Sequence, residues 1–440
     1  EQRRKNLTQL FIPICLETLL YMLSGMVDTL MLSSVNDQAV GAVGTANTYI
    51  GIFIIMFSVI SSGMVAVMTQ NIGAGRPGVA YQARQLGLAF NAVLGVIMSL
   101  FLSLGAGTIL SGVGVADALM QPAKTYLQIV GGFCILNALI PICSSYLRAF
   151  GFSKEPLYAS IIGNVINFCL NAFFLFVLHK GVAGVATATV ISRIINLVIV
   201  VLLGAVLVKA KQHPERESNR AVMGQIIRIG LPSACETAIY NVSMTLVIRF
   251  LNQMDAQGLN VTARSYTMQI TNFSYCVGAA LAQANAIMTG WHIGAKEYDA
   301  CDRGTRKAAI IGVIVAVILE TMFALCSGWI MQLFSKDPQM VSLVGKLLAI
   351  DIVLEMGRVT NLVYGQALKT SGDAVFPVVM GACFMILCSV GGTYLFGIRL
   401  GLLAVGAYIG MAGDECVRAV GMYLRWKSGK WKEKGLVKSR

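Results

Sequence analysis

Two carboxylates stand in the first apolar stretch of the chain. Glu17 and Asp28 lie within a run of residues that is long enough to cross the hydrocarbon core of a membrane as a helix. They are about three helical turns apart and therefore share one face, about 16 Å apart along the axis. A charged side chain at bilayer depth costs roughly 2.5–3.5 kcal/mol on insertion scales. We therefore expect this face to line a cavity; the alternative for Asp28 is an interfacial position near the outer end of the helix.

A later apolar stretch carries three asparagines on one helix face. Asn164, Asn167 and Asn171 are spaced at i, i+3 and i+7. Side-chain amides hydrogen-bond across membrane helices, so one interpretation is contact between helices. The other interpretation is a polar wall that faces Asp28, and the residue types leave both open.

Further charges lie in apolar stretches of the second half. Asp351, Glu355, Arg358 and Asn361 fall within one predicted helix, in which Glu355 and Arg358 are spaced to form an i, i+3 ion pair. That pair is either a stabilising lock or a contact that breaks during a conformational cycle. Glu236 follows the start of another predicted helix, and Glu17 and Glu236 are each either functional or partners for nearby helix ends.

The chain repeats its own landmarks at a nearly constant offset. Three motifs of the first half return in the same order in the second: Pro13-x-x-x-Glu17 as Pro232-x-x-x-Glu236, Ile72-Gly73-Ala74 as Ile293-Gly294-Ala295, and Leu147-Arg148-x-x-Gly151-x-x-x-x-Pro156 as Leu368-Lys369-x-x-Gly372-x-x-x-x-Pro377. In a membrane protein, such a duplication builds a pathway between the halves. The counterpart of Asp28 is Val247, so this outer carboxylate belongs to the first half alone.

Composition indicates an all-α integral membrane protein. Only 12% of the residues are charged and the mean hydropathy is +0.72, whereas soluble domains carry about 25% charged residues. The net charge of +13 fits basic cytoplasmic loops and does not require nucleic acid. The eleven cysteines form no Cys-x-x-Cys pair, and there are three histidines, so we expect no zinc or iron–sulfur site. No nucleotide-binding glycine loop or catalytic triad is visible, so we expect neither an enzyme nor a bound cofactor.

Hydropathy predicts twelve transmembrane helices. The predicted spans are 8–33, 39–70, 84–111, 121–146, 156–178, 182–209, 224–252, 260–290, 305–332, 340–366, 375–397 and 400–424. Alternate loops are basic, which places both termini in the cytoplasm. Six spans per half make the two lobes a parallel repeat, related by a pseudo-two-fold axis along the membrane normal. We predict an N-terminal lobe (1–209), a linker (210–222), a C-terminal lobe (223–424) and a basic cytoplasmic tail (425–440).

These features together resemble the Multidrug And Toxin Extrusion (MATE) transporters of prokaryotic type. The resemblance rests on motifs along nearly the whole chain: Pro13 and Val27-Asp28-Thr29, Ala39 to Gly44, Gln70-x-Ile72-Gly73-Ala74, Gly181-Val-Ala-Gly184, and Glu355-x-Gly357-Arg358-x-x-Asn361 followed by Gly372-Asp373 and Pro377. It implies two six-helix bundles, a bacterial cytoplasmic-membrane location, and export of organic, mostly cationic compounds in exchange for H⁺ or Na⁺.

The resemblance also assigns roles to particular residues. It makes Asp28 the ion-coupling residue, with Na⁺ as a possible ligand, and we expect the amides of Asn164, Asn167 and Asn171 to help it bind the ion. Where one branch has a second aspartate on helix 5, this chain has an asparagine, Asn171. The remaining candidates for substrate binding or gating are Glu17, Glu236, Asp351, Glu355, Arg358 and Asn361.

Several functions remain open at this point. The first is an ion-coupled exporter of small organic compounds that acts as a monomer in the lipid bilayer. The second is a flippase for a lipid-linked substrate or an exporter of one narrow metabolite. A membrane-embedded enzyme or receptor is the third, and no catalytic or sensing motif favours it.

Overall fold

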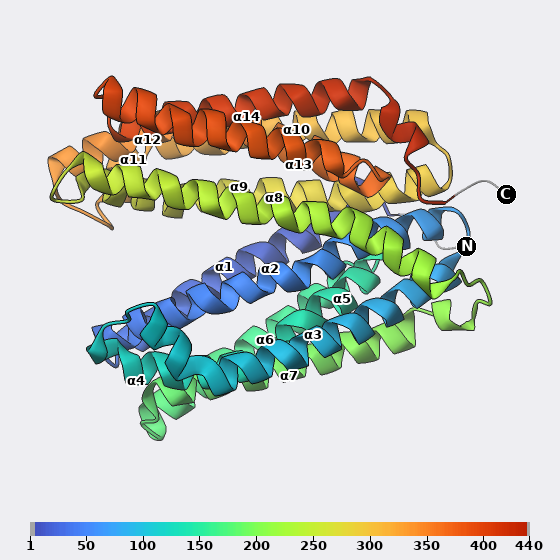
Figure 1. Ribbon diagram of the computed structural model, residues 1–440, viewed down its shortest axis with the longest axis horizontal. Coiled ribbons are helices and arrows are strands. Elements are labelled where there is room, and N and C mark those ends of the chain that lie inside the picture. The colour runs from blue at the N-terminus through green and yellow to red at the C-terminus, as the bar shows by residue number, and fades with distance from the viewer. Residues whose placement is uncertain (1–4, 438–440) are drawn as a thin grey trace. The chain divides into compact units, whose positions relative to one another are not determined.

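All regular elements of the described chain are helical. The computed structural model describes residues 5–437, and within that range the chain forms fourteen α-helices joined by short π and 3-10 segments (Figure 1). By its contacts the chain divides into two compact units, Glu1–Leu231 (unit 1) and Pro232–Arg440 (unit 2). The division falls inside one helix, at the proline that opens the second repeat, while the sequence-based boundary at 210–222 stays a prediction.

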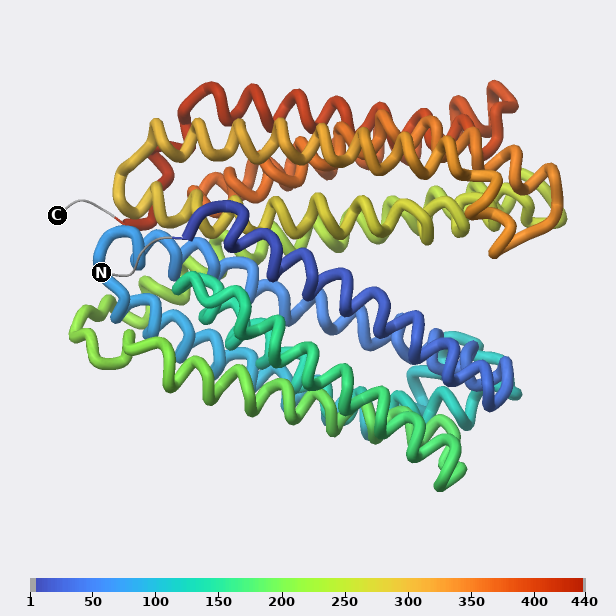
Figure 2. Tube along the Cα trace, turned by 180° about the vertical axis from the view of Figure 1, so that it is seen from behind, coloured from blue at the N-terminus to red at the C-terminus, as the bar shows by residue number. Residues whose placement is uncertain are grey.

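Unit 1 contains seven complete α-helices and the start of an eighth. They are α1 (Leu7–Ser33), α2 (Asp37–Gly73), α3 (Pro77–Gly112), α4 (Asp117–Tyr126), α5 (Ile135–Ala149), α6 (Lys154–Ala172), α7 (Gly181–Leu207) and the first part of α8 (Asn219–Met254). Within the unit, the long helices run side by side (Figures 1 and 2). A buried apolar cluster from α1 to α7 forms the core, including Ala42, Ala46, Leu102 and Leu127.

Unit 2 contains the rest of α8 and six further α-helices. These are α9 (Leu259–Gly294), α10 (Tyr298–Leu325), α11 (Ser327–Met331), α12 (Pro338–Ser371), α13 (Val375–Phe384) and α14 (Ala404–Lys427). Two π segments, η4 (Met385–Val390) and η5 (Thr393–Arg399), extend α13. The apolar core includes Val247, Val344, Leu347 and Ala407.

The architecture confirms the predicted all-α, two-lobed membrane fold. Seven described helices are apolar and long enough to span a bilayer on their own, and the bent pair Asp117–Gly131 and Ile135–Ala149 makes eight if it is one span. The helices α8, α9, α12 and α14 are also long enough at about 1.5 Å per residue, but they fall outside this apolar set. Three of them bury charged side chains inside unit 2, including Arg264, Asp351 and Asp414, and such residues lower the apolar character of a helix.

Some predicted helix boundaries were wrong for a common reason. The third helix begins at Pro77 rather than at 84, and the ninth begins at Tyr298 rather than at 305. Hydropathy marks only the apolar part of a helix, whereas α3 begins with Pro77 and Gly78 and α10 begins with Tyr298 and Asp299, all of low hydropathy. The ninth predicted span also ends early, because Cys326 separates α10 from α11. The fourth span, predicted as 121–146, bends by 44° between η1 (Leu127–Gly131) and α5.

The start of α8 is held against α2 by two glycines. A Cβ atom on Gly63 would lie 1.9 Å from the carbonyl oxygen of Ile226, and one on Gly230 would lie 1.6 Å from that of Val59. Only glycine permits this backbone-to-backbone approach. The first turns of α8 therefore pack as part of unit 1, up to the residue before Pro232.

In unit 1, the chain that follows the last complete helix folds back on the unit. We call this segment, residues 208–218, the linker strap. Glu217 forms two hydrogen bonds between its backbone and the Gln82 side chain, at 2.6 Å and 2.9 Å, and its carboxylate pairs with Arg76. The backbone also passes so close to Gly78 that a Cβ atom there would lie 2.5 Å from the Glu215 carbonyl oxygen. The strap thus covers the turn between α2 and α3.

In unit 2, the chain after α14 folds back in a similar way. We call residues 428–437 the tail strap. Trp431 is buried and stacks on Trp426, with ring centroids 4.0 Å apart and planes 7° from parallel. Trp426 donates a hydrogen bond to Asp302 at the start of α10. A Cβ atom on Gly372, which has a φ of +109°, would lie 2.1 Å from the Lys434 carbonyl oxygen. The tail strap therefore ties α14 to the start of α10 and the end of α12.

Candidate ion and substrate sites

In unit 1, Asp28 of α1 accepts hydrogen bonds from two amides of α6. The Nδ2 atom of Asn171 lies 2.7 Å from Oδ1 of Asp28, and that of Asn167 lies 3.3 Å and 3.4 Å from its two oxygens. Both asparagines are buried, and their i, i+4 spacing places them on one face of α6. The structure thus brings Asp28 together with two of the three predicted asparagines.

The same two amides also present unused acceptors. The Oδ1 atoms of Asn167 and Asn171 are buried and have no hydrogen-bond partner within residues 5–437. A buried acceptor without a partner costs about 1–3 kcal/mol. If both amides turned to present these oxygens, the oxygens and the carboxylate would form an oxygen-only set, which suits a hard cation such as Na⁺. The carboxyl group could instead take up a proton, which would also remove its negative charge.

The third asparagine has another partner. Asn164 accepts a hydrogen bond of 2.9 Å from the Ser24 hydroxyl, one turn of α1 away from Asp28. It therefore joins α1 to α6, and no hydrogen bond connects it to Asp28 among the described contacts. Asn164 thus fits the first interpretation, a contact between helices. Asn167 and Asn171 fit the second, a polar wall that faces Asp28.

Glu17, the other carboxylate of α1, lies in an ion pair. Its Oε2 atom is 2.5 Å from Nη2 of Arg148 at the end of α5, and its Oε1 atom accepts a hydrogen bond from Ser160 of α6. The two charged side chains are 18% and 19% exposed. Glu17 therefore connects three helices of unit 1.

The second repeat contains the equivalent ion pair. Glu236 of α8 lies 2.5 Å from Nζ of Lys369 at the end of α12, with exposures of 16% and 12%. Because Lys369 is the repeat counterpart of Arg148, the same pair of positions is joined in both units. This symmetry fits a structural connection between helices, and a role in gating stays a prediction.

The predicted charges of α12 form part of a buried network in unit 2. Arg358 pairs with Glu355 at 2.5 Å and lies 3.9 Å from Glu415 of α14. Asn361 donates a hydrogen bond of 3.2 Å to Glu415. The predicted stripe therefore connects α12 to α14.

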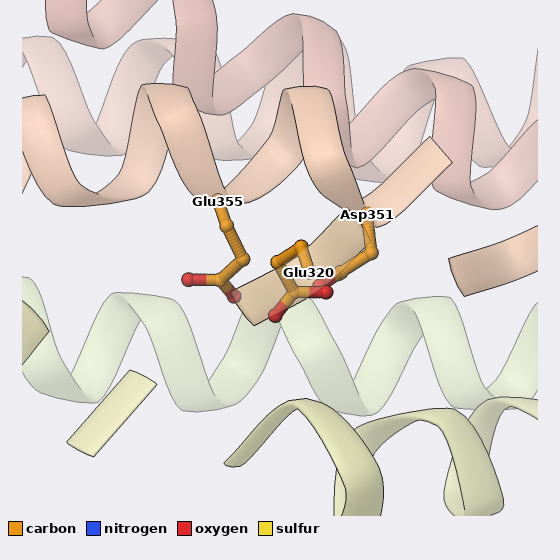
Figure 3. Close-up of side chains that lie close together, drawn as sticks. All are labelled: Glu320, Asp351 and Glu355. Atoms are coloured by element: carbon orange, nitrogen blue, oxygen red, sulfur yellow. The ribbon is translucent and has the colours of Figure 1, made fainter. Parts of the chain in front are cut away.

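Asp351 lies in a second group of acids beside this network. Figure 3 shows Asp351 and Glu355 on successive turns of α12, with Glu320 of α10 reaching toward them. One oxygen atom from each of the three carboxylates lies within 4.8 Å of the other two, and the three residues are buried.

Sequence reasoning missed several of these charged residues. Glu320 interrupts an apolar run of α10, and α14 carries Asp414, Glu415 and Arg418, all of them buried. Arg418 forms ion pairs with both Asp414 and Glu415, each at 2.9 Å. The cost of placing a charge in a membrane helix, applied equally to every predicted span, would have singled out these residues.

A further missed residue is a basic one in unit 1. Arg193 lies in the middle of α7 and is near enough to Asp28 to interact with it electrostatically. Arg193 therefore places a positive charge near the negative charge of the Asp28 carboxylate.

Comparisons with known proteins are consistent over the whole chain. The family model described as MatE matches residues 13–173 and 232–395. The uncharacterized transporter YisQ of Bacillus subtilis (strain 168) is 33% identical over 97% of this chain and 94% of its own length. The probable multidrug resistance protein NorM of Thermotoga maritima is 23% identical, over 99% of this chain and 94% of its own.

Solved structures show the same fold. A multidrug resistance MATE family transporter of the MOP superfamily, in an outward-facing conformation, has a TM-score of 0.88 at 18% identity, over 98% of this chain and 96% of its own. At this level of identity the likeness concerns the fold.

Proposed function

This chain belongs to the MatE family of membrane transporters, and from that premise we propose that it is a secondary active exporter of organic, mostly cationic compounds in exchange for H⁺ or Na⁺. The family consists of transporters, not enzymes, and the chain is a multi-pass membrane protein of that kind. The proposed location is the bacterial cytoplasmic membrane, with both termini in the cytoplasm and a monomer as the working unit.

The Asp28 site is the observation on which the proposed coupling depends. Asp28 is held by Asn167 and Asn171, while two buried amide oxygens beside it have no partner in the described chain. A Na⁺ ion would bind the carboxylate and draw these oxygens toward itself as the amides turn, whereas a proton would neutralise the carboxylate. Either ion would change the net charge at the Asp28 carboxylate in unit 1.

Antiport follows if the ion and the substrate exclude each other. In its charged form Asp28 attracts an organic cation, and that attraction is lost when an ion neutralises it. Binding of the external ion therefore favours release of the substrate. By the same linkage, binding of the substrate favours release of the ion. Broad substrate choice is supported by relatives described as probable multidrug resistance proteins.

Transport in inside-out vesicles tests this proposal. Vesicles containing the wild type, Asp28→Asn or Asp37→Asn are supplied with a fluorescent organic cation, and a proton gradient or a sodium gradient is imposed separately. We expect one gradient to drive uptake by the wild type and no uptake above vector controls for Asp28→Asn at equal expression. Asp37→Asn is the matched control, because this acid is exposed at the start of α2 and should leave transport unchanged.

Two results would contradict the proposal. Gradient-driven uptake of normal rate by Asp28→Asn would remove Asp28 from the coupling step. Failure of the wild type to move any organic cation under either gradient would favour a narrow metabolite or a lipid-linked substrate instead.

A further inference from the structure

A cavity opens at the end of unit 2 that lies away from the tail strap. The last turn of α12 meets the strap at Gly372, so Pro338, where α12 begins, is about 50 Å from it at 1.5 Å per residue. Figure 1 shows α11 at this far end of the unit. The cavity has a volume of about 750 Å³, within the range of small-ligand sites. Its polar lining consists of Gln332, Ser335, Lys336 and Ser342.

The side chains around the cavity are typical of a boundary between membrane and water. Trp329 follows the lining residue Gly328 and is 83% exposed, whereas the other three tryptophans of the chain are at most 4% exposed. Tryptophan is enriched where the hydrocarbon core meets the headgroups. Leu325, the last residue of an apolar span, and Leu333 are 82% and 85% exposed, so they are available to lipid chains.

Two lysines give this boundary a positive charge. Lys336 lines the cavity, and Lys346 follows Ser342 by four residues, which places it on the same face of α12 one turn farther along. Both lysines are exposed, and neither side chain has an ion pair or a hydrogen bond in the described part of the chain. A lysine inside a membrane helix extends its side chain toward the headgroups.

The neighbouring acid does not neutralise these lysines. Asp337 is the only acidic residue between 326 and 346. Its carboxylate accepts a hydrogen bond of 3.0 Å from the backbone N–H of Gln339 and so caps the start of α12. The positive charge of Lys336 and Lys346 is therefore left for an anion.

The chemistry of the cavity indicates which anion fits. Ammonium, hydroxyl and amide groups donate hydrogen bonds to phosphate oxygens, and the charged donors bind them most strongly. A soluble phosphate would use the lysines but leave the exposed leucines without a partner, whereas a phospholipid covers both. A zwitterionic headgroup brings a cation next to Lys336. A glycerol headgroup brings hydroxyls instead, which Gln332 and Ser342 can bind.

We propose that this cavity binds the headgroup of an anionic phospholipid, phosphatidylglycerol, with its phosphate held by Lys336 and Lys346. The site shares no residue with the Asp28 site or with the buried acids of α10 and α12. It also does not depend on which compounds the protein exports. The bound lipid would hold the connection between α10 and α12 at the membrane surface.

Quenching of tryptophan fluorescence by brominated lipid tests the proposal, because Trp329 lies beside the cavity. The purified full chain is reconstituted in phosphatidylcholine bilayers. These contain a rising fraction either of phosphatidylglycerol brominated near the start of its acyl chains or of equally brominated phosphatidylcholine. Trp329→Phe identifies the share of the quenching that comes from this side chain. We expect binding of phosphatidylglycerol to be roughly 25 times stronger than that of phosphatidylcholine, since each lysine near a membrane surface contributes about fivefold.

Substitutions in the cavity should reduce this preference. Lys336→Gln and Lys346→Gln should each lower it by about fivefold, and the double variant should remove most of it. Ser342→Ala leaves the charge unchanged and should lower the preference by about threefold through the lost hydrogen bond. Lys180→Gln is the matched control, because it removes an exposed lysine of unit 1 and should leave the preference unchanged.

Three results would overturn the proposal. The first is equal quenching of wild-type Trp329 by the two lipids, and the second is a preference that survives the loss of both lysines. The third is a preference that disappears with the lysines but keeps its full size in Ser342→Ala. That result would indicate a general attraction between positive charge and an anionic surface, without a headgroup in this cavity. Because all the substituted side chains are exposed, we expect the variants to fold like the wild type.

Discussion

The ion pair between Glu17 and Arg148 allows a structural role to be distinguished from a transport role. The perturbation is a double-mutant cycle with Glu17→Gln, Arg148→Gln and the double variant. If the pair serves to hold α1 and α6 to the end of α5, then removing both charges should harm the protein less than removing either one.

The magnitude follows from the geometry. With the nearest nitrogen and oxygen atoms 2.5 Å apart, the centres of the two charges are about 4 Å apart, which corresponds to about 4 kcal/mol at an effective dielectric constant of about 20. Removing one partner of a buried pair costs about 3–5 kcal/mol. Because the two side chains keep slight access to solvent, we expect each single variant to lose about 2–3 kcal/mol of unfolding free energy. The coupling energy should be at least about 1 kcal/mol.

Two measurements complete this test. Unfolding of the purified variants in mixed micelles gives the free energies, and vesicle transport gives the activity. We expect the double variant to recover most of the stability and transport that each single variant loses. Additive losses of stability would refute the ion-pair reasoning, and a stable double variant without transport would assign Glu17 to the transport pathway. The same cycle on Glu236 and Lys369 should give coupling of the same sign.

Two further predictions concern close packing. Gly63→Ala should destabilise unit 1 by about 1–3 kcal/mol in thermal unfolding, because the new Cβ atom would collide with the α8 backbone. In Gly51→Ala, on the same helix, the new Cβ atom meets nothing within 4 Å, so this control should be neutral or slightly stabilising. Equal melting temperatures of these two variants would contradict the close approach. Trp431→Ala should release the tail strap and speed tryptic cleavage after Lys430 and Lys432, while Trp431→Phe retains the stacking and should be cleaved more slowly than the alanine variant. Cleavage of Trp431→Ala at the wild-type rate would show that the stacking does not hold the strap.

The sequence was informative wherever a single helix carried the signal. The lengths of the apolar stretches located the helices, and the internal repeat showed that Glu17 and Glu236 occupy equivalent positions. The i, i+3 spacing anticipated the pair of Glu355 and Arg358, which the structure contains. These relations are local along the chain or compare two stretches of it, so they need no knowledge of which helices are neighbours.

Partners on different helices could not be predicted in this way. Arg148 and Lys369 both lie in a repeated motif, yet nothing in their spacing shows that they pair with Glu17 and Glu236. Likewise, the position of Glu320 on α10 gives no sign that it meets Asp351 on α12. Such pairs depend on helix packing and rotation, which a hydropathy pattern leaves undetermined.

The linker strap and the tail strap add a fastening segment to the helices of each half. Each follows the last complete helix of its own half, and each is fastened by a close backbone approach to a glycine, Gly78 in one and Gly372 in the other. Each unit therefore carries its own fastening segment, although the two segments approach positions that do not correspond in the repeat, since the counterpart of Gly372 is Gly151. A protein cut between 208 and 218 would lose the fastening of its first half, whereas one divided after Leu231 would leave both halves with theirs.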